Sequence, residues 1–221
     1  MNFPDLLLPT NLLWAANAVA LFVLLHCARQ AHWRTLSSTM LHVFLGFCVT
    51  LGLLWSIRAG IKPGLNFHVL GATVLTLMFG PYLALIALAL ILLLATAFGL
   101  SGLESYGINF ALMALLPVLI SHGLFRWADR KLPNHFFIYV LVDGFFAGAA
   151  AMAALGFASC FILSEAGAYS SSYLHSEYLP FYMLMAWSEA LLTGMAVTLM
   201  AVYRPHWLVT FDDQRYLKVR R

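Results

Sequence analysis

The sequence has few charged residues: Asp, Glu, Lys and Arg make up 10% of 221 residues, whereas hydrophobic residues make up 62%. A soluble domain has about 25% charged and about 45–50% apolar residues. A soluble fold must cover its surface with polar groups, so the apolar excess has to face lipid. The composition therefore excludes a soluble protein. The net charge of +3 comes from basic residues spread over several loops, and no nucleic-acid partner is expected.

A disulfide framework is also absent. The three cysteines, Cys27, Cys48 and Cys160, each lie inside an apolar run and form no CxxC pair. We interpret them as small buried hydrophobic residues.

The sequence has no cleavable signal, no ATP-binding loop and no repeat. The opening residues lack a basic region, and no small-residue cleavage site follows the first apolar run. We expect the mature chain to start at Met1. We also expect one transmembrane domain over 1–221, with an external segment at 1–10, a short cytoplasmic tail at 211–221 and no enzyme activity. Energy for any transport must come from another chain or from an ion gradient.

Long apolar runs dominate what remains. A helix needs about 20 apolar residues to cross a hydrocarbon core of about 30 Å. The third run ends at Gly80-Pro81, which favours a tight hairpin with the fourth, and a re-entrant half-helix is the alternative. The predicted fold class is all-α, a polytopic membrane bundle of about seven transmembrane helices. The predicted segments are 12–28, 41–57, 67–80, 82–100, 110–125, 136–163 and 181–203.

Basic residues predict the orientation. With seven helices, Arg58 and Lys62 fall on one side, and the other ten Lys and Arg residues fall on the opposite side. Basic loops are retained in the cytoplasm, so we expect the N-terminus outside and the C-terminus inside a cell (inner) membrane. The ten are Arg29, Arg34, Arg126, Arg130, Lys131, Arg204, Arg215, Lys218, Arg220 and Arg221.

Ionisable residues inside apolar runs are the first functional candidates, because they are costly in lipid. Glu189 and Asp143 are the carboxyl groups of this kind, and each could also be a structural group bonded to a neighbouring helix. His68 stands at the start of the third run. His26, His42 and His122 fall in the inner half of the bilayer. They could be interfacial or core residues, or they could line an exit path for a transported ion. The sequence assigns no role to these three histidines or to Asp143.

The opening Met1-Asn2-Phe3-Pro4-Asp5 is apolar and too short to span a membrane. It could lie on the membrane surface or fold into the bundle. In the second case, its free α-amine would become available as a ligand.

Four blocks of sequence together resemble one known family. They are Met1 to Asp5 with Leu8-Pro9, His68-Val69-Leu70-Gly71 through Phe79-Gly80-Pro81, Gly107-Ile108-Asn109 with Met113, and Ser188 to Thr193 with Arg204-Pro205. In this order they are similar to the cobalt/nickel-binding membrane components of energy-coupling-factor transporters, the CbiM/NikM family. The resemblance implies uptake of a divalent transition-metal ion, nickel or cobalt, with separate ATPase and membrane coupling subunits.

The resemblance also implies a ligand set. The family holds its ion with the N-terminal amine, the backbone nitrogen and imidazole of residue 2, and a later histidine. Carried over, these are Met1, Asn2 and His68, with Asn66, Asn109 and Glu189 around them. Position 2 departs from the family, because an amide is a poorer ligand than imidazole for nickel or cobalt.

Two other classes of function remain open at this stage. One is a membrane-embedded accessory or assembly factor for a metalloenzyme, which would handle metal without pumping it. The other is a haem protein that uses His26, His42 or His122, and it is disfavoured because no spacing pairs these histidines. Neighbouring genes would separate the first of these from an uptake protein.

Overall fold

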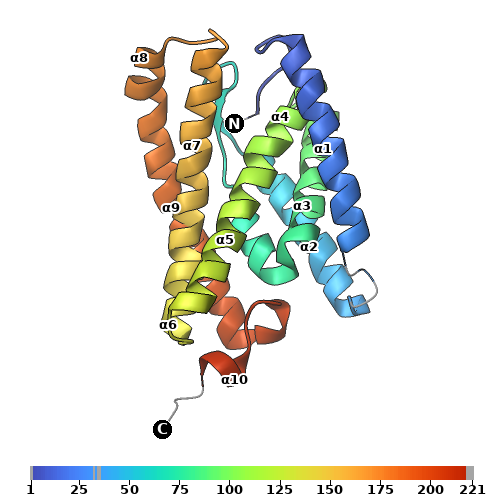
Figure 1. Cartoon of the computed structure of the whole chain (residues 1–221), viewed down its shortest axis with the longest axis vertical. Coiled ribbons are helices and arrows are strands. Elements are labelled where there is room, and N and C mark those ends of the chain that lie inside the picture. Colours follow the sequence, from blue (N-terminus) through green and yellow to red (C-terminus); the bar gives the residue numbers. More distant parts are fainter. Residues whose placement is uncertain (1, 32, 34–35, 218–221) are drawn as a thin grey trace.

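The computed structural model is an all-helical bundle with one small hairpin, and it describes every residue except 1, 32, 34–35 and 218–221 (Figure 1). Six helices in the described chain are long and apolar enough to cross a membrane, in agreement with the predicted fold class. They cover Thr10–Gln30, Ser38–Ser56, Ala72–Ala97, Tyr106–Lys131, Phe136–Glu165 and Ser171–Tyr203.

Several of these long helices join α-helical turns through a wider π-helical stretch. The elements are α1 (Thr10–Gln30), α2 (Ser38–Ser56), β1 (Ala59–Lys62), β2 (Leu65–Phe67), α3 (Ala72–Ala97), α4 (Tyr106–Phe110), α5 (Leu116–Lys131), α6 (Phe136–Ile138), α7 (Ala147–Glu165), α8 (Ser171–Tyr173), α9 (Leu179–Tyr203) and α10 (Asp213–Tyr216). The π-helical stretches are Ala111–Leu115, Tyr139–Phe146 and Leu174–Tyr178, and Pro205–Trp207 is a 3-10 turn.

The sequence predicts about seven segments and the structure has six long helices, because the third and fourth predicted segments both fall in α3, which is broken between them. Gly80 has φ 77° and ψ 170°, which is outside the helical region, and Pro81 follows it. Residues 72–79 form a first arm of eight residues, about 12 Å long at 1.5 Å per residue. This arm is too short to span about 30 Å, so the third predicted segment is a half-length helix.

The predicted start of that segment is wrong. Residues 67–71 are not helical: Phe67 ends β2, and the helix begins only at Ala72. Gly71 has φ +68°, and a Cβ there would lie 2.5 Å from a methyl of Leu51, so the sharp turn requires glycine. The seventh segment also begins ten residues earlier than predicted, at Ser171.

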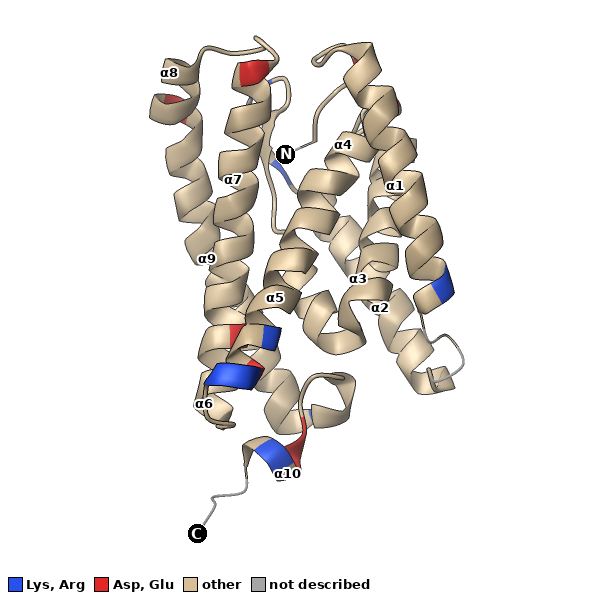
Figure 2. Ribbon diagram, in the orientation of Figure 1, with Lys and Arg blue, Asp and Glu red and all other residues tan. Residues whose placement is uncertain are grey.

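The bundle has two ends of different construction. We call the end formed by residues 2–9, 58–71 and 98–105 the mouth, and the end formed by residues 131–139 and 204–217 the base. Most Lys, Arg, Asp and Glu residues lie toward these two ends (Figure 2). Arg58 and Lys62 are at the mouth, and the pair of Arg215 with Asp129 lies toward the base.

Close helix contacts occur at small residues. A Cβ on Gly144 would lie 3.5 Å from the Cα of Gly194, and one on Gly148 would lie 3.1 Å from Thr193 Oγ1. Both neighbours belong to α9. Gly144 and Gly148 therefore let their helix pack closely against α9 of the same chain.

Candidate functional site at the mouth

The N-terminal segment folds into the mouth of the bundle. Phe3 is fully buried and Asn2 is 2% exposed. The Asn109 carboxamide holds the backbone of Phe3 on both sides: its Oδ1 accepts from Phe3 N at 2.8 Å, and its Nδ2 donates to Phe3 O at 3.0 Å. The alternative in which this segment lies on the membrane surface is therefore wrong for the described residues.

Asp5 fixes the segment to the loop before α4. Its two carboxylate oxygens accept from Leu103 N at 3.0 Å and Ser105 N at 2.9 Å, and Ser105 Oγ donates to Pro4 O at 3.0 Å. Gly102 is required beside it, because a Cβ there would lie 2.1 Å from Asp5 Oδ1. This role of Asp5 was not predicted from the sequence, where the available signal was a carboxylate two residues after Phe3.

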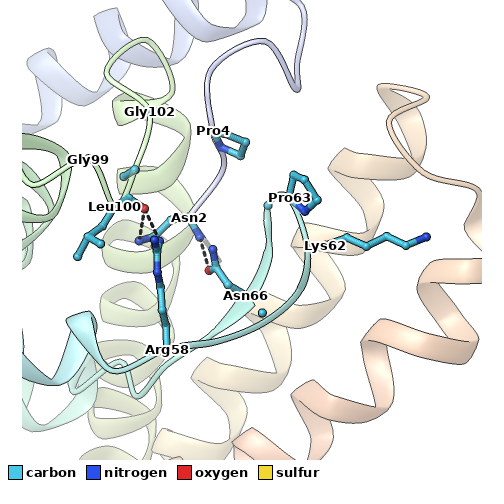
Figure 3. Close-up of a pocket in the computed structure, with 12 residues that line it drawn as sticks. Asn2, Pro4, Arg58, Lys62, Pro63, Asn66, Gly99, Leu100 and Gly102 are labelled. Carbon is cyan, nitrogen blue, oxygen red and sulfur yellow. Dashed lines mark hydrogen bonds between the residues drawn. The ribbon is translucent and has the colours of Figure 1, made fainter.

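Asn2 is the centre of the site. Its backbone N donates to Asn66 Oδ1 at 2.9 Å, and its Nδ2 donates to Leu100 O at 3.2 Å (Figure 3). Its Oδ1 lies 3.2 Å from His68 Nε2. Segments far apart in the chain thus bring Asn2, Asn66 and His68 together.

His68 lies beneath Asn2 and against Trp55. The two rings have centroids 4.7 Å apart, and Trp55 Nε1 donates to Leu70 O at 3.3 Å. Burial lowers the pKa of His68 to about 3, so its imidazole is neutral near pH 7. Two oxygens face the ring: Asn2 Oδ1 lies near Nε2, and Val69 O lies 3.0 Å from Nδ1. A neutral imidazole carries only one N–H, so it can donate to only one of them. The tautomer that donates to Val69 leaves the Nε2 lone pair facing Asn2.

Glu189 supports the site from below. Its Oε2 accepts from Leu70 N at 2.9 Å and its Oε1 accepts from Gly71 N at 2.8 Å, and its side chain is 1% exposed. These two N–H groups precede α3 and have no helical partner there. Glu189 therefore fixes the backbone just after His68, and no contact joins it directly to Asn2 in the described structure.

The other histidines lie elsewhere. His26 packs on Tyr82 with ring centroids 6.0 Å apart, His42 bonds within its own helix, and His122 packs near Phe125. Within the described residues, no three His, Cys, Asp or Glu side chains gather as a metal site. Met1, one of the expected ligands, lies outside the described residues.

A pocket opens above Asn2, between the N-terminal segment, the β1–β2 hairpin and the loop after α3. Its volume is about 540 Å³. Figure 3 shows the Arg58 side chain reaching the same carbonyl, Leu100 O, that Asn2 Nδ2 contacts, and Arg58 donates to it at 2.6 Å. The Lys62 side chain points away from Asn2 in the same view and lies 4.0 Å from the centre of the Tyr173 ring.

Comparison with known proteins gives a family and a fold. Residues 2–207 match the family model CbiM, described as the cobalt uptake substrate-specific transmembrane region. The crystal structure of a truncated transition metal transporter is similar at 21% identity with a TM-score of 0.79, covering 92% of this chain and 99% of that one. A second crystal structure of a transition metal transporter is similar at 21% identity and TM-score 0.79, covering 91% and 93%. No curated protein matches the sequence.

Proposed function

The chain belongs to the CbiM family, and on that premise we propose that its substrate ion binds at the mouth, between Asn2 and His68. As a member, it is a multi-pass membrane protein that serves as the substrate-specific component of cobalt or transition-metal uptake, and it is not an enzyme. The open question is where this particular chain holds the ion, and how well.

The observation that carries the proposal is the buried contact between Asn2 Oδ1 and His68 Nε2, which are 3.2 Å apart. Two ligands at about 2.1 Å from one ion are about 3.0 Å apart at a right angle and about 3.4 Å apart at a tetrahedral angle. The two atoms are thus spaced as neighbouring ligands of one first-row ion. A cation also suits two lone pairs that face each other, and a neutral imidazole needs no deprotonation to bind it.

The remaining ligands in the proposal are the α-amine of Met1 and the backbone nitrogen of Asn2, which would give up its N–H bond to Asn66 on binding the ion. Support comes from the family resemblance and from the burial of the neighbouring Asn2. Asn66 and Asn109 position the backbone of residues 2 and 3, and Glu189 positions the backbone after His68. These three residues would orient the ligands without touching the ion.

We further propose cobalt or nickel as the ion, and separate ATPase and membrane coupling subunits as the partners, as the family implies. The proposed orientation has the mouth outside and the base in the cytoplasm, since the predicted topology puts ten of the twelve Lys and Arg residues on the side opposite Arg58 and Lys62. A reporter fused after Arg221 should then be active in the cytoplasm.

Calorimetric titration of the purified protein with Co²⁺ and Ni²⁺ tests the site. His68→Ala and a one-residue extension before Met1 should each abolish binding, whereas a C-terminal tag and His175→Ala, at an exposed histidine, should not. Asn2→His should raise the affinity, because imidazole is the better ligand. Binding should also weaken as the pH falls, since an α-amine of pKa about 8 must lose its proton. Unchanged binding in both the extension and His68→Ala would place the site elsewhere.

A further inference from the structure

The pocket above Asn2 is larger than a bare ion needs. Its volume of about 540 Å³ falls within the roughly 300–1,000 Å³ typical of small-molecule sites. It is lined by Asn2, Pro4, Arg58, Gly60, Lys62, Pro63, Gly64, Asn66, Gly99, Leu100, Ser101 and Gly102. A molecule with polar groups therefore fits between the entrance and the proposed ion site.

The charge of the pocket does not suit a bare divalent cation. No Asp or Glu is among the lining residues, and the nearby Asp5 carboxylate is occupied by the N–H groups of Leu103 and Ser105. The Arg58 guanidinium lies beside Asn2 and donates one hydrogen bond to Leu100 O. A guanidinium has five N–H donors in a fork that matches a carboxylate, so Arg58 keeps donors for an anionic ligand.

Beyond the ligands proposed above, the described protein offers the ion no carboxylate at the pocket. The described residues contain no group of three His, Cys, Asp or Glu, and the site has an amide where the family has an imidazole. Carboxylate and water oxygens would have to complete the coordination of a divalent ion. The pocket has room for such ligands and a cation that would bind them.

We infer that this chain takes its metal as an anionic chelate, in which carboxylates of a small organic acid stay on the ion and bind Arg58 while His68 and Asn2 approach the metal. This inference rests on the proposed ion site and adds the chemical class of the substrate. The geometry that carries it is the cavity with Arg58 and Asn2 at one carbonyl oxygen.

The test uses the purified full chain immobilised in detergent, with radioactive cobalt and radioactive citrate counted separately. The probes are Co²⁺ alone, the equimolar cobalt citrate complex, which is an anion, and citrate alone. Arg58→Gln removes the guanidinium and Arg58→Lys keeps the charge without the fork. Arg29→Gln is the matched control, because it removes an arginine charge from the last turn of α1 and Arg29 does not line the pocket.

We expect both labels to bind together, and cobalt citrate to bind at least about tenfold tighter than Co²⁺ alone. Arg58→Gln should weaken binding of the complex about fivefold to tenfold, Arg58→Lys should weaken it less than Arg58→Gln does, and Arg29→Gln should change it less than about twofold. Salt should weaken the binding, because it screens exposed charges.

Other results overturn the inference in distinguishable ways. If citrate strips cobalt from the protein, and Co²⁺ alone binds in a His68-dependent manner, the ion site stands and the chelate is wrong. If citrate alone binds as well as the complex, the pocket is an anion site unrelated to metal. If neither form of cobalt binds, the proposed function of the site fails together with the inference.

Discussion

The mouth and the base lie at the two ends of one bundle, and different kinds of interaction stabilise them. At the mouth, carboxamides and carboxylates bind backbone groups far away in the sequence, as Asn109 binds Phe3 and Glu189 binds Gly71. At the base, aromatic rings pack together: Tyr139 lies 4.9 Å from Phe211 and 5.0 Å from Tyr216 between ring centroids. Directional bonds fix backbone positions to within tenths of an ångström, as an ion site requires, whereas ring packing mainly fills space.

The two buried carboxyl groups make the contrast sharpest. Both oxygens of Glu189 accept backbone N–H groups. Asp143, at the base and 2% exposed, has an oxygen, Oδ1, with no hydrogen-bond partner among the described residues. In the sequence the two carboxyl groups are alike, since each lies inside an apolar run. The structure shows that only the carboxyl group at the mouth holds the backbone of other segments in place.

The largest effect is expected from Glu189→Leu. It leaves the N–H groups of Leu70 and Gly71 buried without an acceptor, at about 1–3 kcal/mol each. Glu189→Gln keeps one acceptor oxygen and should lose roughly half as much. Thermal denaturation in detergent measures both. Equal losses would mean that the negative charge, and not the pair of bonds, is what matters.

The next effect is a pH dependence of the metal-free protein. The pKa of His68 falls from its usual 6.5 to about 3 on folding, so below about pH 6.5 only the unfolded chain gains a proton there. The free energy of unfolding should therefore decrease as the pH falls from 6.5, by up to about 1.4 kcal/mol per pH unit. Above pH 7 it should be flat. Denaturation midpoints between pH 7.5 and pH 5 test this, and His68→Gln should lose the slope.

A smaller effect is expected at the base from Tyr139→Phe. The change keeps the ring contacts and removes the hydroxyl that lies 2.7 Å from Thr210 Oγ1. Thr210 keeps its bond to Leu77 O at 2.8 Å, so no group loses its only partner. The cost should be about 0.5–1.5 kcal/mol, measured by the same denaturation. Loss of cobalt binding in this variant would contradict the separation of the two ends.

The smallest effect is expected from Asp143→Leu. Replacing a buried polar group that lacks a partner with an apolar one is close to neutral or slightly stabilising. The midpoint of denaturation should match the parent protein or exceed it. A loss comparable with that of Glu189→Leu would show that Asp143 holds the base together, and the contrast between the two carboxyl groups would not stand.

The amino-acid sequence by itself determined the membrane fold, the positions of most spans and the break at Gly80. These features depend on local properties, namely the length of apolar runs and the backbone preferences of Gly and Pro. The blocks that contain Asn2, His68 and Glu189 were singled out by the sequence, and they meet in the structure at the proposed site.

The tertiary structure alone decided how that region is built. The roles of Asp5 and Trp55, and Arg58 beside Asn2, have no local signal, because their partners lie 15 to 100 positions away along the chain. Glu189 bonds residues 118 and 119 positions away. Its effect on residues 70 and 71 is also why the helix begins at Ala72, five residues later than the apolar run predicts. A backbone N–H in lipid takes the best acceptor within reach, and only the packed bundle fixes which acceptor that is.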